Sequence, residues 1–417
     1  MISTLERPEA KPAGLHDIAQ ALDGHIISNA VVAALFACTG PLAILLLVAT
    51  KAGLSIAETN AWILGAYGIG GSITLAMSVL YKQPLVFAFT TPGMVLMATA
   101  FDSLSLPEAV GAYLVVGFLI IVLGLTGFVS HLTRLCPLPI VFGMVAGVFL
   151  PISVNVVTGF SQQPVVSLVT VAGFVIVSAM PRYGRVLPPV LASLLFGGIV
   201  IGLTGRFSPT VIPPGIFALP VVVKPDFNWI GVAELAAPLV ISVVVIQNMQ
   251  GFAILRSVGH KPPVNAMTLM CGLGSIPMAF LGSVPTCVTG PAAGIIVGSA
   301  PVKRHFASAI VFGIILIVFG LAAPAMTWLA AGLPPTFIAT VGGLALLPVL
   351  QQAFRATFSG PLALGGLVAF LVTVAGQPIL NIGAPFWGLF FGILVAWLLE
   401  YKEMRAAISP TQGVSAS

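Results

Sequence analysis

Charged side chains are scarce in this sequence. Only 6% of its 417 residues are charged and 58% are hydrophobic, which gives a mean hydropathy of +1.13. Soluble domains carry about 25% charged residues, so the composition excludes an ordinary soluble protein. The formal net charge is +5, but the basic residues are dispersed between hydrophobic runs. We therefore expect no nucleic-acid partner.

Motifs of redox, metal and nucleotide chemistry are also missing. The four cysteines (Cys38, Cys136, Cys271 and Cys287) lie in or beside apolar runs without C-x-x-C spacing, which indicates packing and no metal site. The chain has no G-x-x-x-x-G-K-[ST], so we expect neither ATP coupling nor a cofactor. The apolar runs hold no nucleophile–base constellation and no filter-like sequence. An intramembrane enzyme and a passive channel are both disfavoured.

The N-terminal segment 1–25 has no apolar core and holds Glu6, Glu9, Asp17 and Asp23. It lacks the pattern of a signal peptide. We expect a cytoplasmic tail that ends in a short amphipathic stretch.

Apolar runs near the length of a bilayer-spanning helix fill the rest of the chain. They are apolar on all sides, which favours helices over alternating barrel strands. The sequence thus predicts an all-α polytopic membrane protein with fourteen membrane elements, at 26–50, 58–80, 84–101, 108–130, 136–156, 164–180, 187–204, 232–255, 264–279, 280–301, 306–330, 334–350, 359–376 and 384–401.

The distribution of lysine and arginine orients these elements. With both termini inside, the outer side receives only Lys51, Arg206 and Lys224. The inner side receives the other thirteen of the sixteen, namely Arg7, Lys11, Lys82, Arg134, Arg182, Arg185, Arg256, Lys261, Lys303, Arg304, Arg355, Lys402 and Arg405. The positive-inside rule therefore favours cytoplasmic termini in the inner (plasma) membrane. A polar external linker, 205–231, divides the spans into seven plus seven, so the second half is an inverted repeat of the first.

Two elements are interrupted at corresponding places. The third runs from Pro84 to Phe101 and has Thr91-Pro92-Gly93 in its middle, and the tenth has Thr289-Gly290-Pro291. In each, a β-prone stretch precedes a proline that suits the start of a helix. A strand followed by a half-helix of about eleven residues would cross the bilayer.

Opposed half-helices would point two N-termini at one central point. Their N–H groups and dipoles favour an anion there, and paired broken helices in inverted repeats mark transporter sites. The alternative is that Pro92 and Pro291 only kink ordinary helices.

The densest polar cluster at membrane depth is Gln247-Asn248-Met249-Gln250. Helical spacing places Gln247 and Gln250 on nearly one face and turns Asn248 aside. We predict that the two glutamines line a binding pocket and that Asn248 bonds neighbouring helices. The alternative for all three is interhelical bonding. Because Gln247 is a neutral amide, it suits a carboxylate substrate better than an acidic side chain would.

Three segments resemble motifs of the bacterial benzoate/proton symporter (BenE) family. They are Ala88-Phe-Thr-Thr-Pro-Gly93, Ile246-Gln-Asn-Met-Gln-Gly251 and Asn381-Ile-Gly-Ala-Pro-Phe-Trp-Gly-Leu389, and the similarity covers roughly residues 30–400. The chain departs from the motifs at Phe89 and Thr90, where the family has Trp and Ser, and over Val288–Gly294.

The resemblance implies a fold shared with nucleobase and sulfate-type anion transporters. A core domain would comprise 26–131 and 232–330, and a gate domain 132–204 and 331–401, followed by a cytoplasmic tail at 402–417. It also implies a homodimer and an elevator-like movement. The expected function is proton-coupled uptake of benzoate or a similar aromatic carboxylate. The alternative is another small anion or a nucleobase.

The expected substrate-binding residues lie around the two half-helix starts and on the eighth span. They are Phe89, Thr90, Thr91, Gly93, Gln247, Gln250, Thr289, Gly290 and Ala292. Plain helix capping by the threonines and plain packing of Phe89 are the alternatives. No Asp or Glu falls near the predicted midplane. The proton would therefore travel on the substrate carboxylate or through a peripheral relay, for which Asp102 and Glu234 are candidates.

Overall fold

The computed structural model describes residues 5–9, 11–129, 137–180, 187–208, 215–298, 301–380 and 382–408. Several positions discussed above lie outside these ranges, namely Arg134, Cys136, Arg182, Arg185, Asn381, the boundary between 131 and 132, and most of the C-terminal tail.

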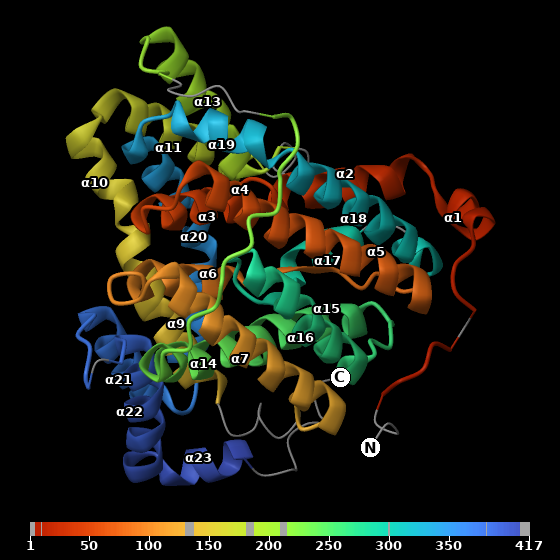
Figure 1. Cartoon of the computed structure of the whole chain (residues 1–417). Coiled ribbons are helices and arrows are strands. Elements are labelled where there is room, and N and C mark those ends of the chain that lie inside the picture. The colour runs from red at the N-terminus through yellow and green to blue at the C-terminus, as the bar shows by residue number, and fades with distance from the viewer. Residues whose placement is uncertain are drawn as a thin grey trace.

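Helices make up almost all of the described chain (Figure 1). The first half contains α1 (Leu15–Ala21), α2 (Gly24–Ala37), α3 (Gly40–Lys51), α4 (Ile56–Ile63), the π-helical η2 (Leu64–Ile69), α5 (Gly70–Tyr81), β1 (Phe87–Phe89), α6 (Thr91–Ala100), α7 (Leu106–Thr126), α9 (Leu138–Ser153), α10 (Asn155–Gln162), α11 (Pro164–Ala179) and α13 (Pro189–Leu203).

The second half follows the linker. It contains α14 (Trp229–Ile241), the π-helical η3 (Ser242–Asn248), α15 (Met249–Ser257), α16 (Val264–Phe280), β2 (Thr286–Val288), α17 (Gly290–Ile296), the 3₁₀ turn η4 (Val302–Arg304), α18 (His305–Leu321), α19 (Ala323–Ala331), α20 (Pro335–Phe358), α21 (Ala363–Ala375), α22 (Ala384–Leu399) and α23 (Tyr401–Ile408).

Within the described ranges, seven helices are long and apolar enough to cross a membrane. The number is eight if α22 and α23, which are bent by 111°, form one span. Five shorter apolar helices of 10–17 residues accompany them. A mostly helical polytopic membrane protein is thus confirmed, and the count of fourteen spans stays a prediction.

In two of the predicted spans a second helix starts at a proline after a short break. The span at 26–50 breaks between α2 and α3, and the span at 306–330 breaks between α18 and α19. In both cases a proline, Pro41 or Pro324, occupies the first turn of the second helix. Proline has no N–H to donate to the preceding turn, so the helix restarts at these points.

The linker and the N-terminal segment mark two sets of helix ends. Backbone N–H groups of the linker bond the carbonyls of Leu321, Phe280 and Pro107 at the ends of α18, α16 and α7. In Figure 1 the linker is the green trace that descends from α13 to α14. The N-terminal segment instead contacts the opposite ends of α16 and α18. This grouping matches the predicted alternation of the spans.

The N-terminal segment is fastened to the helices along its length. The Glu6 carboxylate accepts hydrogen bonds from the backbone N–H groups of Asn265 and Ala266 at the start of α16, at 3.1–3.2 Å. Asp17 pairs with Lys82 at 2.9 Å and Asp23 with Arg304 at 2.7 Å. The Lys82 ammonium and the Gly14 N–H lower the pKa of Asp17. The segment is therefore a packed strap across α5, α16 and α18.

Strands β1 and β2 pair antiparallel near the centre of the protein, with Phe87 opposite Val288 and Phe89 opposite Thr286. Two further bonds extend the pair, because Thr90 N–H donates to Pro285 and Thr289 N–H to Val86, both at 3.0 Å. Each strand leads directly into a short helix, α6 or α17. The predicted strand-then-half-helix elements are thus present in both halves.

Side chains of neighbouring helices accept hydrogen bonds from backbone N–H groups on the outer edges of the strands. Thr74 Oγ1 on α5 accepts from the Phe87 N–H at 2.8 Å. Ser275 Oγ on α16 accepts from the Thr286 N–H at 3.0 Å. Phe87 and Thr286 are the first residues of their strands, so these two bonds are equivalent in the two halves. The match supports the inverted repeat.

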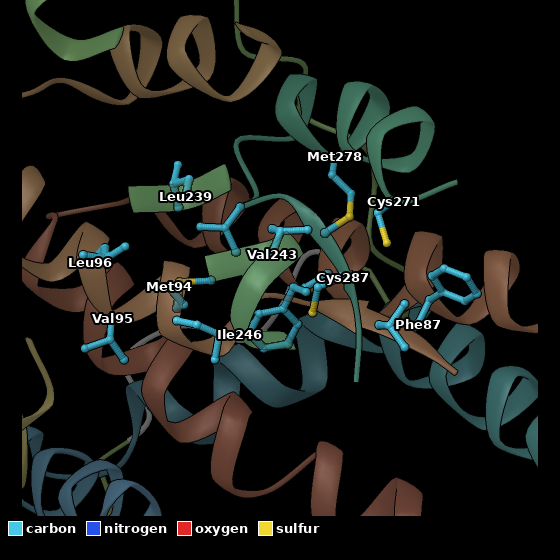
Figure 2. Packing of buried hydrophobic residues seen from close by; sticks show 14 of the residues in the cluster. Phe87, Met94, Val95, Leu96, Leu239, Val243, Ile246, Cys271, Met278 and Cys287 are labelled. Carbon is cyan, nitrogen blue, oxygen red and sulfur yellow. The ribbon is translucent and has the colours of Figure 1, made fainter. Parts of the chain in front are cut away.

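Apolar packing surrounds the strand pair. Figure 2 shows Met94, Val95 and Leu96 of α6 in one cluster with side chains of α14 and η3. Cys271 and Cys287 belong to the same buried cluster, which confirms them as packing residues. Glycines allow close helix crossings elsewhere, since a Cβ at Gly71 of α5 would lie 2.6 Å from the Gly313 carbonyl oxygen of α18. The central elements are thus tightly enclosed.

Replacing Thr74 by valine keeps the side-chain shape and leaves the buried Phe87 N–H without its acceptor. We expect Thr74→Val to destabilise the protein by about 1–3 kcal/mol and to lower the midpoint of thermal unfolding in detergent.

The matched control is Thr126→Val, because the exposed Thr126 hydroxyl bonds only carbonyls of its own helix. Equal midpoints for the two variants would contradict a structural role for the strand-edge bond.

Candidate functional site

A cavity of about 250 Å³ lies where the two half-helices begin. Thr91 and Pro92 of α6 and Thr289 and Pro291 beside α17 line it. It is also lined by residues of α2, α3, η2, α9, α11, α13, η3, α15 and α20. These elements come from both the predicted core and the predicted gate, so the cavity lies between the two groups.

Five of the nine predicted substrate-binding residues line this cavity, namely Phe89, Thr91, Gln247, Gln250 and Thr289. Gln247 is 8% exposed and Gln250 is partly exposed. Gln250 also packs onto the start of α17, where a Cβ at Gly290 would lie 2.6 Å from its Cγ. The two amides therefore stand beside the half-helix starts, as predicted.

The other four predicted residues support the site from behind. Thr90 is fully buried and shares a hydrogen bond of 2.6 Å with Ser242 of η3. Its hydroxyl also accepts from the Gly93 N–H at 3.2 Å, so it caps α6. Gly290 makes room for Gln250, and Ala292 is buried within α17. Capping is thus the observed role of Thr90.

Asn248 serves the strands. Its Oδ1 accepts from the Val288 N–H of β2 at 2.8 Å, and the side chain is fully buried. We predicted bonds to neighbouring helices, but the main partner of Asn248 is a strand, and only the Cys271 thiol of α16 donates to the same oxygen, at 3.7 Å.

The half-helices differ in length from the expected eleven residues. Helix α6 has 10 residues and α17 has only 7. Glycine disfavours helix and Pro301 cannot extend it, so Gly294, Gly298 and Pro301 explain the short α17. Because α17 makes less than two turns, α6 offers the stronger dipole to the cavity.

Aromatic side chains form much of the wall. The Phe89 ring meets the Tyr67 ring edge-on at 5.4 Å between centroids. The Tyr67 hydroxyl donates to the Ala37 carbonyl at 2.9 Å, which fixes the ring beside the break between α2 and α3. Phe36, Phe142, Phe149 and Phe174 complete the aromatic lining.

Four polar side chains that line the cavity were not predicted from the sequence: Thr39, Tyr67, Ser178 and Gln352. Thr39 precedes Gly40-Pro41, and this break in an apolar run was a usable signal. Tyr67 lies in a π-helical turn, a feature often found at functional sites, which has no sequence signature. Gln352 reaches the cavity only because α20 packs against α3 and α9.

The two candidate relay residues are not among the residues that line the cavity. Asp102 is exposed and pairs with Lys51 at 3.1 Å. Glu234 is 6% exposed, accepts a hydrogen bond from Ser103 Oγ at 3.4 Å, and packs against Gly383.

A histidine pair lies outside the cavity as well. His260 Nε2 is 3.1 Å from His305 Nδ1. Burial and the neighbouring His305 lower the pKa of His260 to about 4, so its ring is neutral near pH 7. A neutral His260 is a poor proton carrier at that pH.

The sequence of this chain is similar to those of known membrane transport proteins. The sequence model of the family described as "Benzoate membrane transport protein" (BenE) matches residues 21–398. A benzoate membrane transport protein of Acinetobacter baylyi is 28% identical over 373 residues, which cover 88% of this chain and 93% of the relative. Inner membrane protein YdcO of Escherichia coli K12 is 29% identical over 357 residues, which cover 82% and 88%.

Two solved structures share the fold. The transmembrane domain of a cyanobacterium bicarbonate transporter, BicA, has a TM-score of 0.59 at 16% identity, over 96% of this chain and 99% of that chain. The murine Slc26a9 anion transporter in the inward-facing state has a TM-score of 0.62 at 12% identity, over 95% and 74%. These two structures show the fold alone. The family model that matches residues 21–398 shows that this chain belongs to the benzoate membrane transport (BenE) family of membrane transport proteins.

Proposed function

We propose that this protein is a secondary active transporter for proton-coupled uptake of benzoate or a similar aromatic carboxylate across the inner membrane. The observation that carries the proposal is the cavity between the half-helix starts. Aromatic rings and the side-chain amides of Gln247 and Gln250 line it. Family membership supports the same class of cargo.

The lining suits both ends of such a substrate. The amide N–H groups of Gln247 and Gln250 can donate to a carboxylate, and the N-terminus of α6 adds a favourable dipole. The aromatic ring would pack against Phe89 and Tyr67, since offset and edge-on aromatic contacts are favourable. A carboxylate at Gln247 would instead repel the substrate.

The arrangement also favours an elevator-like movement of core against gate. The cavity is lined by α3 and η3 of the predicted core and by α11, α13 and α20 of the predicted gate. Its gate residues include Ser178, Pro189 and Gln352, which lie near helix ends that the predicted topology places inside. Under this proposal both termini are cytoplasmic, fourteen spans form a seven-plus-seven inverted repeat, and the cavity opens toward the inner side. A homodimer belongs to the same proposal.

The proton travels by one of two routes under this proposal. A carboxylic acid substrate normally titrates near 4, so it could carry the proton itself. A relay through Asp102 or Glu234 is the other route, and the burial of Glu234 makes it the better candidate of the two.

Gln247→Glu should weaken benzoate binding by at least about tenfold, because like charges at a few ångströms repel by several kcal/mol. Titration calorimetry with benzoate on the purified protein measures this.

The control for this binding test is Gln377→Glu, since Gln377 is exposed in the connection before α22 and lies outside the cavity. If Gln247→Glu binds benzoate as tightly as the unmodified protein does, the Gln247 amide does not bind the substrate. A panel of sulfate, bicarbonate and uracil as competitors tests the alternative cargo.

Proteoliposomes with labelled benzoate outside should accumulate it when the interior is more alkaline. One proton per substrate gives roughly tenfold accumulation per pH unit, since a tenfold ratio corresponds to about 1.4 kcal/mol. Liposomes without protein control for passive entry of the neutral acid. Protein-dependent uptake that ignores the gradient would reject proton symport.

A further inference from the structure

Glu234 occupies an unusual position for a carboxyl group. It lies in α14 of the predicted core, at the end of the helix that the topology places outside, and it is 6% exposed. Buried charges in proteins are normally paired, because removing an ion from water is costly. Among the described residues, no lysine, arginine or histidine pairs with Glu234.

The partners of this carboxyl group come from both predicted domains. Ser103, which follows α6 in the core, donates its hydroxyl at 3.4 Å. Gly383, which belongs to the predicted gate, lies directly against the carboxyl group of Glu234. Gly383 is the N-cap of α22, and that helix has no capping side chain of its own. Glu234 therefore supplies across the domain boundary the negative charge that a helix N-terminus favours.

The approach to Gly383 is close. A Cβ at this position would lie 2.9 Å from Cδ of Glu234, so only glycine fits without displacing the carboxyl group. The contact is thus built into both the core and the gate.

The other charged groups near this contact have partners of their own or are exposed. Glu234 is therefore the group whose charge can change with pH here. Helices α6, α7, α14 and α22 pack together at this place, and their only acidic residues are Glu108 and Glu234. Glu108 is held within the core by Ser105 and Asn228, at 2.6–2.8 Å. Asp102, beside Ser103, is paired with Lys51. Lys224 and Asp226 lie in the linker that precedes α14 and are exposed.

We propose that Glu234 is a protonation-dependent latch between core and gate. As a carboxylate it lies against Gly383 at the N-terminus of α22 and holds the outer ends of α14 and α22 together, which keeps the outer side closed. When a proton from the outer solution binds to it, the charge is lost, the attraction to the α22 N-terminus weakens and the outer side opens. The contact forms again when Glu234 passes its proton inward, so that one proton enters with each substrate. Glu234 is a positioning residue, and this role rests on the proposed coupled transport.

The test measures the latch directly. Spin labels at Trp229→Cys and Gln377→Cys, both exposed, report the distance between the outer ends of α14 and α22 in the full chain in nanodiscs. We expect the distance distribution to widen when the pH is lowered from 7.5 to 5, because protonation removes the charge of Glu234. In Glu234→Gln, the wide distribution should already be present at pH 7.5 and should not respond to pH.

Two further variants keep the test sharp. Gly383→Ala breaks the contact from the gate side and leaves the carboxyl group in place, so it should also widen the distribution at pH 7.5. Glu108→Gln is the matched control and should respond as the unmodified chain does. A pH response in Glu234→Gln equal to that of the unmodified chain would overturn the latch, as would the absence of any response in the unmodified chain.

Transport by the same variants separates the latch from the proposed function. Glu234→Gln should keep benzoate binding and lose accumulation driven by a pH gradient. If the unmodified protein shows the Glu234-dependent distance change but no uptake of benzoate, the latch stands and the proposed cargo fails.

Discussion

The structure depends on one requirement: the backbone of two short strands at its centre must be fully hydrogen-bonded away from water. A membrane interior offers no solvent partner, so unpaired N–H and C=O groups there cost several kcal/mol each. Strands β1 and β2 satisfy each other on one edge. On the other edge, Thr74, Ser275 and Asn248 accept from the strand N–H groups. Each acceptor lies on a different helix.

This requirement explains why the centre is suited to binding. The strands use only half the thickness that a full helix would cross, so the helices that follow them must start in the middle of the protein. A helix start is a region of unpaired donors and positive potential. The cavity forms where these starts meet the break in the first span and the π-helical turn of the eighth, and the same architecture therefore supplies both the fold and the polar surface of the site.

Much of this arrangement could be predicted from the sequence. Pro92 and Pro291 carry a strong local signal, because proline both ends a ladder and begins a helix. Gln247 and Gln250 stand out because amides are rare in an apolar run, and both line the cavity. These features are local, so a single sequence reveals them.

The remainder depends on contacts between distant segments. Thr90 offers the same hydroxyl whether it faces a substrate or Ser242, and only the packing of η3 against α6 decides. Gln352 and Tyr67 reach the cavity through helix packing. The contact between Glu234 and Gly383 joins residues far apart in the chain and has no motif. The bound N-terminal strap was likewise hidden, since acidic residues before a membrane span fit a free tail equally well.

The strand pair also constrains how the protein is made. The partner of β1 is β2, which is synthesised about 200 residues later, after α6 to α13, the linker and α14 to α16. Until then, β1 has no strand to pair with, and the Phe87 N–H has only the Thr74 hydroxyl as a hydrogen-bond acceptor. The first half therefore reaches the membrane with an incomplete centre, and its final structure is set only when the second half arrives. Two halves with separate sequences are in this sense one cooperative unit of folding.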